Sequence, residues 1–317
     1  MKHKFSITLI LLTMFLATQF IGLFVVDAYS PSSTIDPTTG EIILAQNDLP
    51  FGLQSPEDEP TPTFLSIIFS FALAFALIFV LMKYKWKMII RIWFFFVITL
   101  ALAISINAIL KTSYFLFPIS YSLAALAIAI PLAFLKIFRP NMYIHNGTEL
   151  LIYPGIAAVF VPILTPLSII ALLILISIYD AWAVWKSGIM QKMAKFQMEE
   201  IKIFGGFLIP SASDKVKKQI EKIKTKYQNK KIPKSIQNKK FKVNMAILGG
   251  GDVIFPIIAA GVFMRAYSIT PALFIIFGAL AGLISIFILS KKGKAYPAMP
   301  YITTGIFAGL LLWKLFF

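Results

Sequence analysis

Two aspartates lie where the sequence is otherwise strongly apolar. Asp180 falls within residues 165–185 and Asp252 within residues 243–264, and we place no other acidic residue in a predicted bilayer core. A carboxylate in a membrane span costs about 2.5–3.5 kcal/mol even on insertion scales, so its presence indicates a functional site. Two such carboxyl groups at similar depth are the groups that peptide hydrolysis by paired aspartates requires.

The chemistry of such a pair requires one ionised and one protonated carboxyl group. The ionised group takes a proton from water as the water attacks the carbonyl carbon. The protonated group donates to the carbonyl oxygen and then assists the leaving amine. Because two close carboxylates cannot both ionise cheaply, they share one proton and titrate as a pair.

The residues around both aspartates are of kinds that can shape a site within a membrane. Glycines before Asp252 permit close helix approach and loosen the helix enough to aim a carboxylate. Pro297 and Pro300 prevent a regular helix start and leave backbone groups unpaired, which a membrane tolerates only in a buried or wet place. The residues expected to shape the site are Tyr179, Gly249, Gly250, Gly251, Pro297, Ala298, Met299 and Pro300.

The chain as a whole has the composition of a membrane protein. Hydrophobic residues make up 58% of it and charged residues 14%, and its apolar runs approach the roughly 20 residues that span a bilayer. We predict an all-α polytopic protein with nine transmembrane helices, the first retained rather than removed as a signal peptide. The predicted spans are residues 5–26, 63–82, 92–110, 114–135, 148–163, 165–185, 243–264, 270–290 and 295–316.

The distribution of lysine and arginine predicts the orientation of the chain. With nine alternating spans and a cytoplasmic N-terminus, 27 of the 30 basic residues fall in cytoplasmic segments. Sixteen of these lie in one long loop and count for little, but the remaining ratio is still 11 to 3. We therefore expect a multi-pass protein of a microbial plasma membrane, with its N-terminus in the cytoplasm and its C-terminus outside.

Three parts follow one another along the chain. Residues 1–185 form a predicted six-helix part, with an acidic, proline-rich outer loop at 27–62 that we expect to be flexible and to have no core of its own. Residues 186–242 form a lysine-rich cytoplasmic loop, and residues 243–317 a three-helix part. Within the cytoplasmic loop, Gly205–Pro210 is either a turn or an element that packs near the site or adds a strand to substrate.

The number of residues between each aspartate and the cytoplasmic loop predicts that the two aspartates lie at similar depth in the bilayer. Asp180 lies six residues before Lys186 and Asp252 ten residues after Lys242, which corresponds to roughly 9 Å and 15 Å at the rise of an α-helix. One cytoplasmic loop joins both spans. We therefore expect antiparallel neighbours whose carboxyl groups meet in the inner half of the bilayer.

These residues resemble the motifs of the presenilin and signal peptide peptidase family of intramembrane aspartyl proteases, especially its microbial presenilin homologues. The pattern of that family is YD in the sixth span, GxGD in the seventh and PAL at the ninth. It corresponds here to Tyr179-Asp180, Gly249–Asp252 and Pro297–Pro300, with Met299 where the family usually has leucine. The resemblance implies a horseshoe of helices around a water-accessible aspartate pair.

The resemblance also implies what such a site acts on. A single-span helical substrate, or the remnant of a signal peptide, would approach from the lipid and unwind locally, because a helical peptide bond is shielded from attack. Its unwound part would pair with a strand near the seventh span. The predicted orientation is that of presenilins, since signal peptide peptidases are inverted.

The residue inventory disfavours other protease chemistries. The only two histidines, His3 and His145, come without an HExxH motif, and the absence of cysteine removes thiol catalysis and disulfides. We expect no metal and no cofactor, and we expect His145 to be an ordinary residue of a cytoplasmic loop.

Other functions stay open at this point. A prepilin or preflagellin peptidase also uses a GxGD aspartate, a proton-coupled transporter also holds intramembrane carboxylates, and an inactive relative would only bind helices. The net charge of +16 lies mainly in the lysine-rich loop, where it favours binding to anionic lipid headgroups rather than to nucleic acid.

Overall fold

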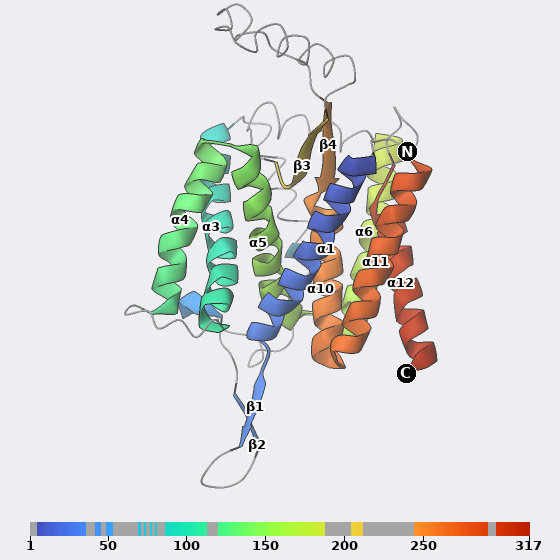
Figure 1. Cartoon of the computed structure of the whole chain (residues 1–317), viewed down its shortest axis with the longest axis horizontal. Coiled ribbons are helices and arrows are strands. Elements are labelled where there is room, and N and C mark those ends of the chain that lie inside the picture. Colours follow the sequence, from blue (N-terminus) through green and yellow to red (C-terminus); the bar gives the residue numbers. More distant parts are fainter. Residues whose placement is uncertain are drawn as a thin grey trace, which may run out of the picture.

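Helices make up most of the computed structural model of this chain (Figure 1). The structure describes residues 5–35, 42–45, 49–52, 69–70, 73, 77, 80, 86–112, 120–187, 204–211, 244–290 and 296–317. The long helices within them are α1 (Phe5–Ala28), α3 (Lys87–Thr112), α4 (Tyr121–Phe138), α5 (Met142–Phe160), α6 (Pro166–Trp182), α10 (Gly250–Ala266), α11 (Ile269–Leu289) and α12 (Met299–Phe316). The strands are β1 (Ser32–Ile35), β2 (Ile42–Ala45), β3 (Gly206–Ser211) and β4 (Asn244–Gly249).

Seven of the described helices are long and apolar enough to cross a bilayer: α1, α3, α4, α5, α6, α11 and α12. Helix α10 has 17 residues; α6 has the same length, but its span continues through the following turn to Lys186 and reaches 21 residues. The predicted span at residues 63–82 lies mostly outside the described residues. The largely helical membrane architecture is therefore confirmed, whereas the number nine and the horseshoe arrangement stay predictions.

The seventh predicted span is not helical over its whole length. Residues 244–249 form β4, which pairs antiparallel with β3, and α10 begins only at Gly250. A helix over the whole of 243–264 would hold Gly249, Gly250 and Gly251 in its interior, where glycine is unfavourable because it loses more backbone freedom on folding than any other residue. Pairing with β3 gives the backbone groups of β4 hydrogen-bond partners. The prediction of a helix over 243–264 was therefore wrong for its first part.

The fifth predicted span, residues 148–163, begins earlier than expected. The helix α5 starts at Met142, where the side chain of Asn141 caps it. This start places His145 on the helix, with 8% of its surface exposed, and it makes Glu149 a buried residue of a membrane-spanning helix. The expectation of a loop histidine was therefore wrong, and Glu149 is an additional buried acidic residue on a helix that is long and apolar enough to span a bilayer.

Part of the predicted outer loop at 27–62 is ordered as a hairpin. Strands β1 and β2 pair antiparallel, with Ser32 opposite Ala45 and Ile35 opposite Ile42. The hairpin extends beyond the end of the helices that is opposite to β3 and β4 (Figure 1). A two-stranded sheet alone has little core, so the correction concerns the local structure of this loop.

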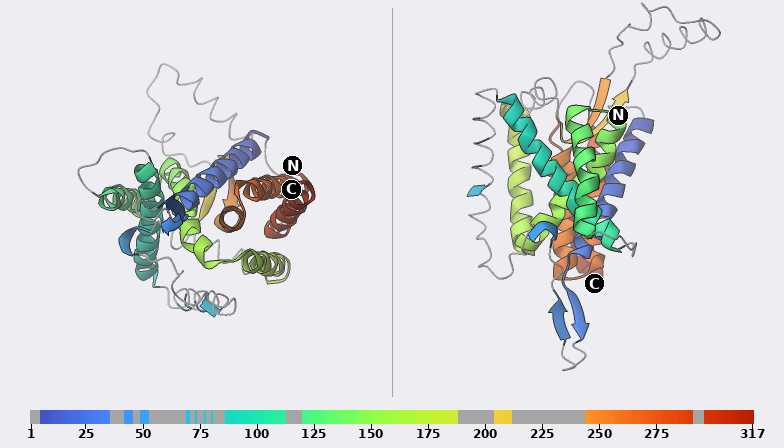
Figure 2. Two further views of the ribbon diagram at one scale, coloured as in Figure 1. Left: turned by 90° about the horizontal axis from the view of Figure 1, so that it is seen from below. Right: turned by 90° about the vertical axis from the view of Figure 1, so that its left-hand side faces the viewer.

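Helix α1 joins the two halves of the chain. It packs against α5 and also against α10 and α11 (Figure 2). Leu11 and Phe15 on α1 are fully buried. The side-chain amide of Gln19 donates to the backbone carbonyl of Val253 in α10 at 3.0 Å. The first helix therefore helps to position the start of α10.

Helices α11 and α12 pack with their backbones in contact. A side chain at Gly278 on α11 would collide with the carbonyl oxygen of Gly305 on α12, and one at Gly305 would collide with the carbonyl oxygen of Gly278. Small residues permit such close approach, which stabilises helix pairs in a membrane through van der Waals contact. This packing positions α12, whose first turn contacts the site described next.

Candidate active site

Asp180 lies in the last turn of α6, where the winding of the helix changes. Helix α6 begins with a capping box formed by Thr165 and Ser168 and runs to Trp182. Residues Ala183–Ser187 then form a π-helical turn. Such turns are frequent at functional sites. The Asp180 side chain is buried, so it needs polar partners within the protein.

The segment Pro297–Pro300 supplies those partners. The backbone N–H of Met299 donates to Asp180 Oδ2 at 3.0 Å, and the backbone of Ala298 hydrogen-bonds the same carboxyl group. Met299 is the first residue of α12, so its N–H has no acceptor within the helix. A helix N-terminus binds negative groups well because its free N–H groups and its dipole both favour them.

Asp252 is held in a related way at the start of α10. Gly249 precedes the helix and Asp252 is its third residue. The backbone N–H of Gly249 donates to the Asp252 carboxyl group, which is one half of a capping box. The charge of Asp180 acts on Asp252. The structure therefore brings the two carboxyl groups within electrostatic reach, each bound by the start of a helix.

The three glycines before Asp252 line a junction between strand and helix rather than the interior of a helix. A Cβ atom at Gly249 would lie 3.1 Å from Asp252 Oδ2, and one at Gly250 would lie 2.8 Å from the hydroxyl of Tyr153. A Cβ atom at Gly251 would meet only the ring of the phenylalanine four residues later, at 3.7 Å. A side chain at Gly249 would therefore crowd Asp252 and one at Gly250 would crowd Tyr153, whereas one at Gly251 would have ordinary contacts.

The apolar patch Gly205–Pro210 lies against this junction as β3. Gly206 stands opposite Gly249 in the sheet, and the N–H of Gly250 donates to the Gly205 carbonyl at 3.2 Å. Gly206 has a φ of +147°, a conformation in which a side chain would be strained. Of the two interpretations of this patch, the structure shows the element packed near the site.

Several polar side chains near the site were not predicted. Tyr153 of α5 is buried, with its ring edge-on to Phe207 of β3 at 5.9 Å between centroids. Ser177 of α6 donates to the hydroxyl of Thr303 in α12 at 2.8 Å, which ties the helix of Asp180 to the helix that binds it. No motif marks these residues, because each contact joins parts of the chain that are far apart in sequence.

Tyr179 was also expected to shape the site. Its side chain is 44% exposed, and its ring stands 6.3 Å from that of Trp182. In the part of the chain that the structure describes, no cluster of three histidine, aspartate or glutamate residues could hold a metal ion. The groups gathered around Asp180 and Asp252 are backbone amides and hydroxyls.

Comparison with known proteins matches the chain to one protein family and to solved structures of similar fold. The family model described as signal-peptide peptidase, presenilin aspartyl protease matches residues 40–317. No curated protein matches the chain in sequence. The fold is similar to that of a presenilin family intramembrane aspartate protease solved in space group C222, with a TM-score of 0.61, 18% identity and coverage of 98% of this chain and 99% of that one. A structure of such a protease in space group P2 gives a TM-score of 0.58 at 18% identity, with 97% of each chain covered.

Proposed function

Since the chain belongs to the signal-peptide peptidase and presenilin family of aspartyl proteases, we propose that Asp180 and Asp252 are the catalytic pair with which it cleaves transmembrane substrates. It is an integral membrane endopeptidase of this family. The observation that carries the proposal is that both carboxyl groups lie at helix starts within electrostatic reach of each other. Family membership favours this activity over a prepilin-type peptidase or a proton-coupled transporter.

The proposed mechanism uses one proton shared by the two aspartates. The ionised carboxyl group takes a proton from water as the water attacks the scissile carbonyl, and the protonated one donates to the carbonyl oxygen. Proton transfer back to the amine then breaks the C–N bond. The backbone N–H groups at Met299 and Gly249 orient the two carboxyl groups before substrate binds, which lowers the reorganisation needed in the transition state.

The outer edge of β4 is the proposed docking site for the unwound substrate. Leu208 turns both its backbone N–H and its C=O away from β4, toward Asn146. Its partner in the antiparallel pair, Ile247, therefore also turns its backbone groups outward. Among the described residues no strand pairs with this edge of β4. The edge leads directly to Gly249 and the site, so an added substrate strand would lie beside Asp252.

The experiment that tests the function is cleavage of a purified single-span peptide. The protein and the peptide are reconstituted in lipid vesicles, and the products are mapped by mass spectrometry. The proposal expects cuts inside or at the border of the apolar segment of the peptide. If folded wild-type protein gives no such products, or cuts only soluble flanks, the proposed function is wrong.

A further inference from the structure

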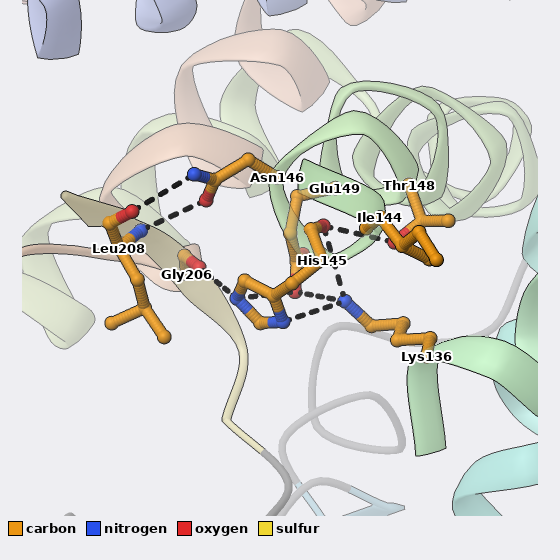
Figure 3. Close-up of polar contacts among 8 residues, drawn as sticks. All are labelled: Lys136, Ile144, His145, Asn146, Thr148, Glu149, Gly206 and Leu208. Carbon is orange, nitrogen blue, oxygen red and sulfur yellow. Dashed lines mark hydrogen bonds and ion pairs between the residues drawn. The ribbon is translucent and has the colours of Figure 1, made fainter. Parts of the chain in front are cut away.

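A polar cluster, buried except for its partly exposed asparagine, lies beside the site and takes no part in the chemistry described so far. It consists of Lys136 at the end of α4 and of His145, Asn146 and Glu149 on α5 (Figure 3). We call these four residues the α5 clamp. Lys136, His145 and Glu149 are 5%, 8% and 2% exposed. Ionisable residues within membrane-spanning helices are costly and indicate function.

The hydrogen bonds of the clamp fix the tautomer of its histidine. The Lys136 ammonium lies 2.7 Å from Glu149 Oε1 and 3.2 Å from His145 Nδ1. Because an ammonium group only donates, His145 Nδ1 accepts and its proton resides on Nε2. That Nε2–H donates to the backbone carbonyl of Gly206 in β3 at 2.8 Å. The ion pair thus orients the imidazole toward β3.

Asn146 completes the contact with β3. Its side-chain amide donates to the Leu208 carbonyl at 2.8 Å and accepts from the Leu208 N–H at 3.0 Å, as Figure 3 shows. These are the two hydrogen bonds that a residue of a neighbouring strand would make. Pro210, the next residue on this edge of β3, has no N–H to offer. The clamp therefore occupies the outer edge of β3.

The constraint continues from β3 to the aspartate. Phe207 pairs with Leu248 of β4, and the N–H of Gly250 donates to the Gly205 carbonyl. Two residues after Gly250 comes Asp252. A displacement of β3 would therefore move the junction that aims this carboxyl group.

We propose that Asn146 and His145 are positioning residues of the protease: they hold β3 on α5, set the position of β4 and Asp252, and leave only the outer edge of β4 open to substrate. Lys136 and Glu149 orient His145 for this purpose. This inference rests on the proposed function and adds residues to it. Stability alone does not account for the cluster, because a buried ion pair is often replaceable by apolar residues without loss of stability.

The first test is Asn146→Leu, with Asn107→Leu as the matched control. Asn107 is a buried amide on α3 that donates to the Tyr29 hydroxyl at 2.9 Å. Its partner Tyr29 stands three residues before β1, and β1 lies beyond the end of the helices that is opposite to β3 (Figure 1). Both variants should lose thermal stability. Only Asn146→Leu should lower kcat, by about 10- to 100-fold, because small misplacements of reacting groups are that costly.

The positions of the cleaved bonds are a second measurement, and a loss of stability alone would not change them. Because β3 is no longer held on α5, cleavage by Asn146→Leu should spread to neighbouring peptide bonds. Cleavage by Asn107→Leu should stay at the bonds that the wild type cuts. His145→Gln, whose amide can still donate to the Gly206 carbonyl, should retain more activity than His145→Leu. If Asn146→Leu cuts the wild-type bonds with the kcat of Asn107→Leu, the positioning role is overturned.

Amide hydrogen exchange separates this inference from the proposed function. Residues 206–211 and 244–249 should exchange faster in Asn146→Leu and His145→Leu than in wild type or Asn107→Leu. If the wild type cleaves no peptide, the protease proposal has failed and the exchange data alone decide whether the clamp positions the sheet. Unchanged exchange in both strands overturns the inference in either case.

Discussion

At the scale of single residues, both aspartates depend on main-chain donors as much as on their own position. Met299 and Gly249 offer backbone N–H groups at helix starts to Asp180 and Asp252 respectively. These donors restrict each carboxyl group to one orientation. In the proposed mechanism, the remaining lone pairs hold the shared proton and the attacking water.

Replacing either carboxyl group by an amide should abolish cleavage and leave the fold intact. In Asp180→Asn and Asp252→Asn the amide can still accept the backbone hydrogen bond but cannot exchange the shared proton. We expect a loss on the order of 10⁴-fold or more in kcat, as for other residues that act as one catalytic unit. Product formation from a single-span peptide measures it.

A ligand experiment checks that the same variants remain folded. A transition-state analogue whose hydroxyl mimics the hydrated carbonyl should raise the melting temperature of the wild type and not that of either variant. Retained cleavage by a purified Asp→Asn variant would show that the aspartate concerned is not catalytic.

A second prediction separates two neighbouring glycines. In Gly249→Ala the new methyl group would stand 3.1 Å from Asp252 Oδ2, whereas in Gly251→Ala it would have ordinary contact at 3.7 Å. The backbone at Gly249 (φ −63°, ψ 146°) accepts alanine without strain. We expect kcat to fall about tenfold in Gly249→Ala, equivalent to about 1.4 kcal/mol. Equal kcat in both variants at equal melting temperature would contradict this crowding.

At the scale of elements, the pair α11–α12 places the donors of Met299. The two backbones touch at Gly278 and Gly305. A hydrogen bond between the hydroxyl groups of Ser177 and Thr303 links α12 to α6. Displacement of α12 would therefore withdraw the N–H groups that bind Asp180. The packing of this pair contributes to the site as well as to stability.

The corresponding prediction concerns Gly305→Ala. Its methyl group would meet the Gly278 carbonyl, and such overpacking costs about 1–3 kcal/mol. The control is Gly147→Ala on α5, where a Cβ atom meets nothing within 4 Å and helix propensity favours alanine by up to about 1 kcal/mol. Thermal unfolding in detergent should rank Gly147→Ala at or above wild type and Gly305→Ala below it. The reverse order would mean that the helices do not pack at Gly305.

At the scale of the whole molecule, the two ends of the helical bundle differ. Helix α1 begins at the end where β3 and β4 lie, and α12 ends at the opposite one (Figures 1 and 2). The aspartates are therefore at the end of the bundle from which α1 starts. With the predicted cytoplasmic N-terminus, the site would open toward cytoplasmic water.

The absence of cysteine makes this orientation directly testable. Tyr143→Cys, at the start of α5, and Phe317→Cys, at the chain end, each introduce one thiol at a position more than three-quarters exposed. A membrane-impermeant thiol reagent added to intact cells should label Phe317→Cys and should reach Tyr143→Cys only after the cells are opened. The opposite pattern would invert the predicted topology.

The features of this protein that depend on local composition could be predicted from its amino-acid sequence. Apolar runs identify most spans, because the length and hydropathy of a helix suffice for the bilayer to accept it. A carboxylate in such a run is conspicuous because it is costly, so Asp180 and Asp252 were found directly. The Gly249–Asp252 and Pro297–Pro300 motifs pointed to the family that the chain belongs to.

Features that depend on partners distant in the chain could not be predicted and became visible in the folded structure. Residues 244–249 are apolar enough for a membrane-spanning helix, but they form a strand because β3 pairs with them and supplies backbone hydrogen-bond partners. His145 was predicted to be a loop residue and Glu149 was not singled out, because nothing local in the sequence shows that Gly206 and Lys136 are their partners. Likewise the bond from Met299 to Asp180 spans 119 positions. A buried polar group needs a partner wherever the fold can bring one, and sequence spacing does not encode that choice.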